Sequence, residues 1–167
     1  MNFNNQMEHV NWMTFALEEA KKAREFGEVP VGAIIVMDNK IIGRGHNLSI
    51  SNNDPSSHAE IEAIRNAAAH IKNYRLKKAS IYVTLEPCAM CYGAIVHARI
   101  TRLVFGTYDP KTGVCGSSIK LHEQECFNHS PEITGGVLEK DCSYRNDLTK
   151  QSSPTESSPA ADTLRNL

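Results

Sequence analysis

Apolar positions at helical spacing are followed by apolar positions typical of strands in the first third of the chain. Between about Glu8 and Phe26, apolar side chains recur every three or four residues, and Gly27 follows as a helix stop. The apolar run Val31–Met37 is followed by the turn residues 38–40 and by a second apolar pair. This order predicts one amphipathic helix and then a β-hairpin.

Beyond residue 56 the pattern alternates between helical and extended stretches. β-Branched and aromatic residues fill the extended stretches, and Pro87 stands where the first turn of a helix accepts a proline. Strands that alternate with helices predict an α/β domain with three layers, in which helices cover a sheet. The predicted elements are a helix at about Ser57–Ile71, a strand at Ser80–Leu85, a helix at Cys88–Ala98, a strand at Arg102–Gly106 and a last strand at Ile133–Val137 before a short helix.

The length and composition fit one globular domain. The chain has 167 residues, of which 41% are hydrophobic and 22% charged. Residues 150–167 are rich in Ser, Pro and Thr, so we expect a domain over 1–149 and a disordered tail after it. The longest apolar run is about half of a membrane span, and the first ten residues lack the pattern of a secretory signal. We therefore expect a cytoplasmic protein with no membrane partner.

The charge is unevenly distributed along the chain. The formal net charge is −1, but residues 61–120 hold nine Lys and Arg against three acidic residues. This basic segment (residues 61–120) is consistent with a face that attracts phosphate groups. The simpler interpretation is that these are ordinary solvated surface cations, and charge alone favours it.

Two cysteines and one histidine form a candidate metal site. Cys88 and Cys91 lie three positions apart at the start of a predicted helix, where side chains at that spacing are neighbours. His58 lies at the start of another helix, and thiolates and imidazoles are zinc ligands. Five cysteines without a secretory signal favour reduced thiols or a metal over a disulfide framework.

Three protein ligands leave a fourth zinc position for water, whose pKa zinc lowers towards neutrality. A fourth protein ligand would instead make a closed structural site, and that alternative stays open. Six other side chains could supply the fourth ligand, although none has a compelling spacing: Cys115, Cys126, Cys142, His97, His122 and His129.

Glu60 can be interpreted in two ways. A carboxylate beside a zinc-bound water can accept its proton and pass it to a leaving group. Ser57 and Glu60 also match a capping box, with Ser57 as the N-cap of the helix. Glu60 can share a site with His58 only if His58 lies at the frayed helix start, because a spacing of two separates side chains on a regular helix. Together with the cysteine pair, we favour the proton shuttle.

These motifs resemble a known family. His-x-Glu followed by Pro-Cys-x-x-Cys is the signature of the zinc-dependent cytidine and adenosine deaminases. Over about residues 7–142 the chain resembles the bacterial tRNA-specific adenosine deaminases within that group. The resemblance is carried by the segments Val29–Ala33, His58–Ile61, Tyr82–Cys88 and Phe105–Gly113.

The resemblance implies a cytidine-deaminase-like fold with a mixed five-stranded sheet flanked by helices, a homodimer, and one zinc per subunit held by His58, Cys88 and Cys91. It implies a hydrolase that converts adenosine to inosine at the wobble position of a tRNA anticodon, with water attacking C6 and Glu60 moving protons. It also implies substrate contacts by Asn47, Asp109 and Lys111.

Two other functions are consistent with the same motifs. A deaminase of free nucleobases or nucleosides, such as guanine or cytosine, would use the same chemistry, and a structural zinc-binding module would catalyse no reaction.

After Cys142 the family continues with an amphipathic helix, whereas residues 143–148 show no periodic apolar face. That departure affects the expected RNA contacts of the last helix and leaves the zinc ligands untouched.

Overall fold

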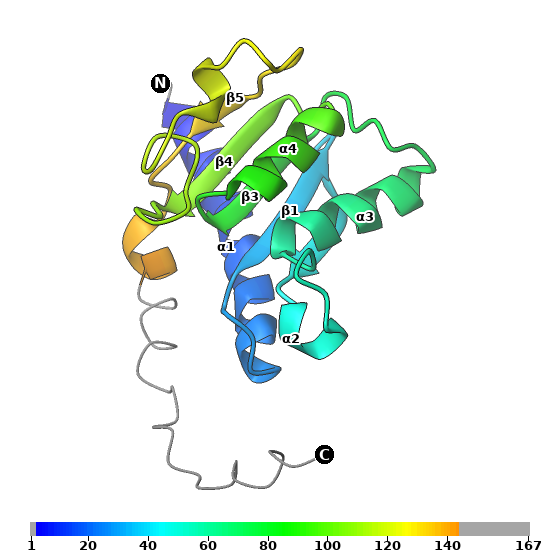
Figure 1. Cartoon of the computed structure of the whole chain (residues 1–167), viewed down its shortest axis with the longest axis vertical. Coiled ribbons are helices and arrows are strands. Elements are labelled where there is room, and N and C mark those ends of the chain that lie inside the picture. The colour runs from blue at the N-terminus through cyan, green and yellow to red at the C-terminus, as the bar shows by residue number, and fades with distance from the viewer. Residues whose placement is uncertain (1–2, 144–167) are drawn as a thin grey trace, which may run out of the picture.

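The computed structural model of this chain describes residues 3–143 and contains one five-stranded sheet with helices on both faces (Figure 1). The strand order is β2-β1-β3-β4-β5. The helices are α1 (Phe3–Glu25), α2 (Ser49–Asn52), α3 (Ala59–Ile71) and α4 (Ala89–His97), with a 3-10 turn at Leu121–Glu123, and the strands are β1 (Gly32–Met37), β2 (Lys40–His46), β3 (Ser80–Leu85), β4 (Arg102–Thr107) and β5 (Glu132–Thr134).

The sheet is mixed, and its pairing defines two ends. β1 runs antiparallel to β2 and β3, whereas β3, β4 and β5 are parallel. Val36 pairs with Ser80, and Ser80 pairs with Arg102, so the end of β1 and the starts of β3 and β4 share one end. We call this the far end, and we call the opposite end, where β3 and β4 finish, the site end.

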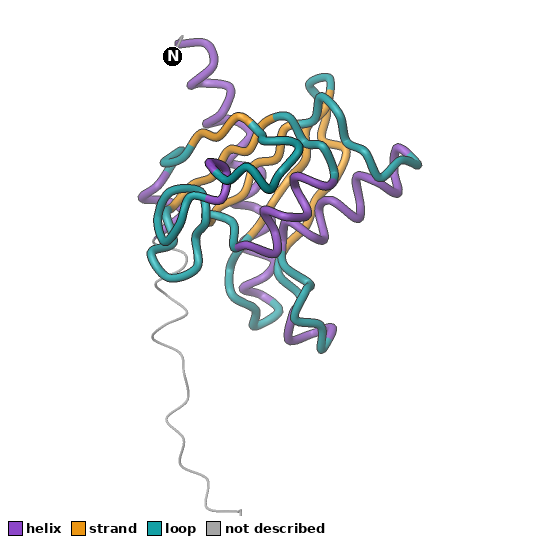
Figure 2. The backbone as a smooth tube through the Cα atoms, turned by 45° about the horizontal axis from the view of Figure 1, so that its top comes forward, coloured by secondary structure: helices purple, strands orange, loops and turns teal. Residues whose placement is uncertain are grey.

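Two apolar layers sandwich the sheet. Ile81 and Val83 of β3 pack in the layer that includes α3 and α4, whereas Tyr82 packs in the layer that includes α1. This alternation is the period-2 pattern of a strand buried on both faces. Figure 1 shows α3 and α4 in front of the sheet with α1 behind it, and the tube in Figure 2 shows the same layering from a tilted view.

α3 rests directly on the backbone of β2. A Cβ atom at Gly43 would overlap the Ala63 carbonyl oxygen, and one at Gly45 would overlap the Ala59 carbonyl oxygen. Only glycine allows backbone to approach backbone so closely. The two glycines therefore fix how closely α3, the helix that begins after His58, packs on β2.

The structure confirms the predicted layered α/β fold and refines its boundaries. α1 begins at Phe3 rather than near residue 8, and β5 ends at Thr134 rather than at Val137. The short α2 was not predicted, and residues 139–143 are helical, as expected for the segment after β5. The expected tail at 150–167 and the segment 144–148 lie outside the described residues. Within residues 3–143, no helix combines the length and apolar character needed to cross a bilayer.

Candidate functional site

His58 and Cys88 both lie at helix N-caps. His58 precedes α3 with φ −80° and ψ 155°, and Cys88 precedes α4 with φ −76° and ψ 172°. Both residues therefore have extended backbones, which lets their side chains point away from the helix axis. Cys91 follows in the first turn of α4 and is completely buried. The prediction that these residues lie at helix starts is confirmed.

The three side chains converge at the site end. The His58 Nδ1 atom lies 3.5 Å from Cys91 Sγ and 3.8 Å from Cys88 Sγ. One ligand atom from each of the three residues lies within 4.8 Å of the others. Tetrahedral zinc with ordinary Zn–N and Zn–S bonds places its ligand atoms roughly 3.5–3.8 Å apart. The two distances from His58 to the cysteines therefore match those of a tetrahedral zinc site.

No fourth protein ligand joins this cluster among residues 3–143. The only group of metal-ligating side chains in that part of the chain consists of His58, Cys88 and Cys91. The six alternative cysteines and histidines all lie within the described residues and are not part of it. A three-ligand set is typical of catalytic zinc sites, whereas structural sites use four.

The contacts within the cluster favour the anionic form of one thiol. A hydrogen bond with Cys91, and a further one with His58, lower the pKa of Cys88 to about 4. The same contact with Cys88 raises the pKa of Cys91, and the contact of His58 with Cys88 raises the pKa of the imidazole. A thiolate is the form in which cysteine binds metals, so the contacts of Cys88 favour the form that a metal would bind.

Glu60 is buried against the same cluster. It is the second residue of α3, only 4% of it is exposed, and its carboxyl group contacts the Cys91 thiol. Burial raises the pKa of Glu60 to about 7, because a charged carboxylate loses its hydration there. A carboxyl group that titrates near neutrality can both accept and donate a proton. Because His58 precedes the helix, the two side chains reach one site despite their spacing.

The capping-box interpretation is wrong. His58, not Ser57, is the N-cap residue of α3, and no side chain of the N-cap residue caps the helix. The Ser57 hydroxyl donates to Asp54 Oδ2 at 3.0 Å. The first free N–H of the helix, that of Ala59, instead donates to Asn47 Oδ1 at 2.9 Å. Asn47, 12 residues earlier at the start of the preceding loop, therefore caps the helix.

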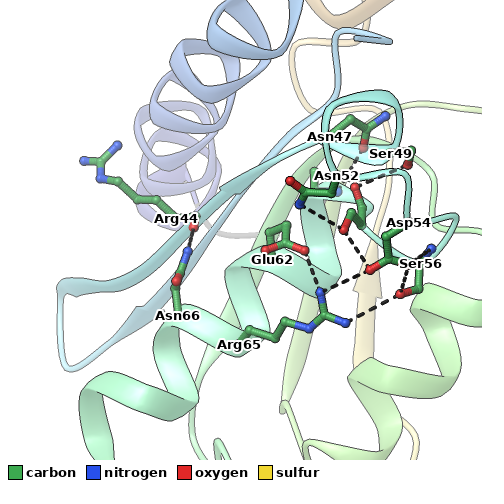
Figure 3. A network of polar contacts seen from close by, with 11 residues as sticks. Arg44, Asn47, Ser49, Asn52, Asp54, Ser56, Glu62, Arg65 and Asn66 are labelled. Carbon is green, nitrogen blue, oxygen red and sulfur yellow. Dashed lines mark hydrogen bonds and ion pairs between the residues drawn. The ribbon is translucent and has the colours of Figure 1, made fainter. Parts of the chain in front are cut away.

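A polar network fixes the loop between β2 and α3 (Figure 3). Asp54 accepts hydrogen bonds from the Ser56 N–H and hydroxyl at 2.8 and 2.7 Å, besides the one from Ser57. Arg65 of α3 lies 3.9 Å from Asp54 and 2.7 Å from Glu62. Asn47 and His58 stand at the two ends of this loop, so the network sets how far apart they lie.

Asp109 and Lys111 lie in the loop after β4, outside the metal cluster. Asp109 Oδ1 accepts the Lys111 N–H at 2.9 Å and the Thr112 N–H at 3.3 Å, and Oδ2 accepts the Thr112 hydroxyl. Burial acts to raise the pKa of Asp109, but the hydrogen bonds from Thr112 and Lys111 outweigh it and lower the pKa below its ordinary value. Asp109 therefore shapes a turn that leaves Lys111 exposed.

Glu86 is a site residue that the sequence reasoning missed. Its carboxylate is 2% exposed and accepts the N–H groups of Asp109, Cys115 and Ser117 at 3.0, 2.8 and 3.1 Å, together with the Ser117 hydroxyl. It thereby connects the start of α4 to the loop that carries Asp109. The available signal was a charged residue at the end of a buried strand, directly before Pro87.

Comparisons with known proteins agree with this geometry. A profile of the MafB19-like deaminase family matches residues 7–141. The chain therefore has the fold of a deaminase of this class, and its site combines a three-ligand cluster with the buried Glu60. A tRNA-specific adenosine deaminase of Haemophilus influenzae is 54% identical over 134 residues, which cover 80% of this chain and 78% of the relative. One of Bacillus subtilis is 47% identical over 78% of this chain and 81% of the relative. The chain belongs to the family of tRNA-specific adenosine deaminases.

Solved structures give the same result. A structure described in a study of A-to-I editing by tRNA:A34 deaminases is 41% identical, with a TM-score of 0.79 over 81% of this chain and 98% of that chain. A guanine deaminase of Nitrosomonas europaea is 18% identical with a TM-score of 0.69 over 84% of each chain, which shows a shared fold alone. The expected cytidine-deaminase-like fold is confirmed.

Proposed function

We propose that this chain hydrolytically deaminates adenosine to inosine at the wobble position of a tRNA anticodon. The observation that carries the proposal is a cluster of three metal-ligating side chains with a buried carboxyl group beside it. Family membership supports the choice of substrate, because the relatives at 54% and 47% identity are tRNA-specific adenosine deaminases. The overall reaction consumes water and releases ammonia.

His58, Cys88 and Cys91 are proposed to hold one zinc ion per subunit. When bound, zinc supplies an activated water molecule for attack on C6 of the adenine. Glu60 would take a proton from the attacking water and deliver it to N1 of the base. It would then take the proton of the new C6 hydroxyl and deliver it to the departing amino group, which leaves as ammonia. Its position against Cys91 and its pKa near 7 suit both directions of transfer.

Asn47, Asp109 and Lys111 are proposed to contact the substrate. Asn47 uses its carbonyl oxygen to cap α3, which leaves its amide NH₂ group as a hydrogen-bond donor. Asp109 holds the turn beside the anticodon loop, and the exposed Lys111 meets the RNA backbone. Because the target base must leave its stack, a loop is a less costly substrate than a duplex.

We also propose a homodimer in the cytoplasm, where tRNA is available. Sedimentation of the purified protein tests the dimer, since a monomer at micromolar concentration would contradict it. The domain boundary between residues 149 and 150 stays a prediction from composition, and limited proteolysis tests it.

The proposed function is tested with a synthetic anticodon stem-loop that contains adenosine at the wobble position. We expect inosine to form with the zinc-loaded protein and to stop when a chelator removes the metal. Glu60→Gln should abolish inosine formation while zinc remains bound. Glu132→Gln is the control, because Glu132 is an acidic residue of β5 whose side chain is 72% exposed and pairs with Arg102, away from the cluster.

The alternatives predict different results in the same assay. Deamination of free guanine or cytosine with no change in the stem-loop would support a nucleobase deaminase. Full activity of the Glu60 variant would remove Glu60 from the reaction. Loss of folding together with the metal, with no turnover of any substrate, would support a structural zinc module.

A further inference from the structure

Most of the basic segment does not surround the metal cluster. Lys111 lies in the loop at the site end, but the connections from α3 to β3 and from α4 to β4 both lie at the far end. These two connections and the first residue of β4 carry six of the nine basic residues of the segment: Lys72, Arg75, Lys77, Lys78, Arg99 and Arg102. The proposed deamination leaves this charge unexplained.

The connection from α3 to β3, residues 72–79, is held firmly in place, and we call it the far-end loop. Its Leu76 side chain is completely buried, and the Leu76 N–H donates to the Ala98 carbonyl at 2.7 Å. The Lys78 N–H donates to the Thr101 hydroxyl at 3.1 Å. An anchored loop presents its exposed side chains in fixed positions, so binding does not have to order them first.

Four cations of the far-end loop have no neutralising partner. Lys72, Arg75, Lys77 and Lys78 are all exposed, and no acidic residue occurs between residues 63 and 85. Within residues 3–143, none of the four forms an ion pair, whereas Arg102 nearby pairs with a glutamate. Unpaired cations on one rigid loop create a positive potential that attracts a polyanion.

An aromatic side chain stands among these cations. Tyr74 is 66% exposed, and the Arg75 guanidinium carbon lies 5.2 Å from the centre of its ring. An exposed ring beside an arginine is a surface on which an unpaired base can stack, while lysines contact the phosphates. An acidic protein would use the cations but would not need the ring, so the combination favours RNA.

We propose that the far-end loop is a second RNA-binding surface, which contacts the tRNA outside its anticodon loop. The proposal rests on the proposed tRNA substrate. The 13 residues of α3 separate the far-end loop from the cluster by about 20 Å. The target nucleotide cannot span that distance, but a whole tRNA can, so the loop adds affinity without touching the reacting atoms.

The test measures binding of full-length tRNA to the zinc-loaded protein at several salt concentrations. The double variant Lys72→Gln/Lys77→Gln removes two cations and leaves the anchor intact. The matched control is Lys21→Gln/Arg24→Gln, which removes two exposed cations from α1 on the opposite face of the sheet. At 0.15 M salt each lost phosphate contact should weaken binding about five-fold, so the double variant should bind about 25-fold more weakly.

Three further results are expected. The slope of log affinity against log salt should fall by about two in the double variant and stay unchanged in the control. Tyr74→Ala should weaken binding at least about five-fold through lost stacking. With full-length tRNA as the substrate for inosine formation, the double variant should raise KM and leave kcat unchanged, because the contact is remote from the chemistry.

An unchanged tRNA affinity and salt slope in the double variant would overturn the proposal and favour an acidic protein as the partner of this surface. Equal losses in the double variant and the control would also overturn it, because they would reflect total charge rather than this loop. A fall in kcat with an unchanged KM would also overturn it, because it would show that the two lysines act on the site and not on tRNA binding. Failure of the proposed function is seen separately, as an absence of inosine formation by the unmodified protein that still binds tRNA.

Discussion

Removing one oxygen from the Glu86 side chain tests how the loop after β4 is held. Glu86 Oε1 accepts the N–H groups of Cys115 and Ser117, and Oε2 accepts the Asp109 N–H and the Ser117 hydroxyl. Glu86→Gln keeps the shape of the side chain but replaces one acceptor by an NH₂ donor. At least one buried N–H group then faces another donor.

The size of the effect follows from these contacts. The serine hydroxyl can rotate and accept, so one orphaned N–H remains, which costs about 1–3 kcal/mol. The remaining hydrogen bonds also lose the strength that a charged acceptor gives them, which adds about 1 kcal/mol. We expect a total loss of about 2–4 kcal/mol in the free energy of unfolding, or about 6–12 °C in Tm for a chain of this size.

Urea denaturation and hydrogen exchange measure this prediction. Amide protection should fall most in residues 109–117, and the KM for the stem-loop should rise because this loop carries Lys111. Glu132→Gln is the control, because Glu132 has a side chain that is 72% exposed and pairs only with Arg102. A loss below about 1 kcal/mol, with protection of residues 109–117 unchanged, would refute the idea that Glu86 organises the loop.

Three other predictions concern the metal ligands, the packing of α3 on β2, and the pH dependence of the free energy of unfolding. Cys88→Ala should lower the zinc content measured by atomic absorption, because it removes one of three protein ligands, and full occupancy would show that the ligand set is wrong. Gly45→Ala should destabilise the protein by about 1–3 kcal/mol in urea melts, since the added Cβ would overlap α3, and a neutral result would contradict the close approach. Burial acts to raise the pKa of Glu28, but hydrogen bonds from Ser51 and Ile50 outweigh it and hold the pKa below its ordinary value of 4.5. A depressed folded-state pKa gives stability that is present above pH 4.5 and is lost as the pH falls through the folded-state value. Unfolding measured from pH 6 to pH 3 should therefore lose this contribution in the native protein and not in Glu28→Gln, and parallel curves would contradict the assignment.

The sequence predicted the layered fold because its strongest signals are local. Val31–Met37 is buried on both faces and forms a continuous apolar run, and Ser80–Leu85, with side chains buried on both faces, is rich in β-branched and aromatic residues. α2 could not be predicted in the same way, because it has four residues, none of them buried. Its position depends on Glu28, which accepts the N–H groups of Ile50 and Ser51 from more than 20 residues away.

The site was only partly predictable, because some of its features are local in the sequence and others depend on contacts between separate segments. The spacing of Cys88 and Cys91 on a helix start is local, and a sequence pattern detects it. The N-cap of α3 was placed one residue too early, at Ser57 instead of His58, because Ser57 matches a capping residue but its hydroxyl donates to Asp54. The actual cap, Asn47, and the role of Glu86 both depend on contacts between distant segments. No local pattern encodes such contacts.

The placement of His58 and Cys88 at helix N-caps has an evolutionary consequence. Both residues are positioned relative to the beginning of a helix, so the lengths of α3 and α4 do not enter the metal geometry. Insertions or deletions of a helical turn at the C-terminal ends of α3 and α4 would change the length of these helices and leave the positions of His58 and Cys88 unchanged. Related enzymes are therefore free to diversify at those ends, where new recognition surfaces can arise without risk to the reaction.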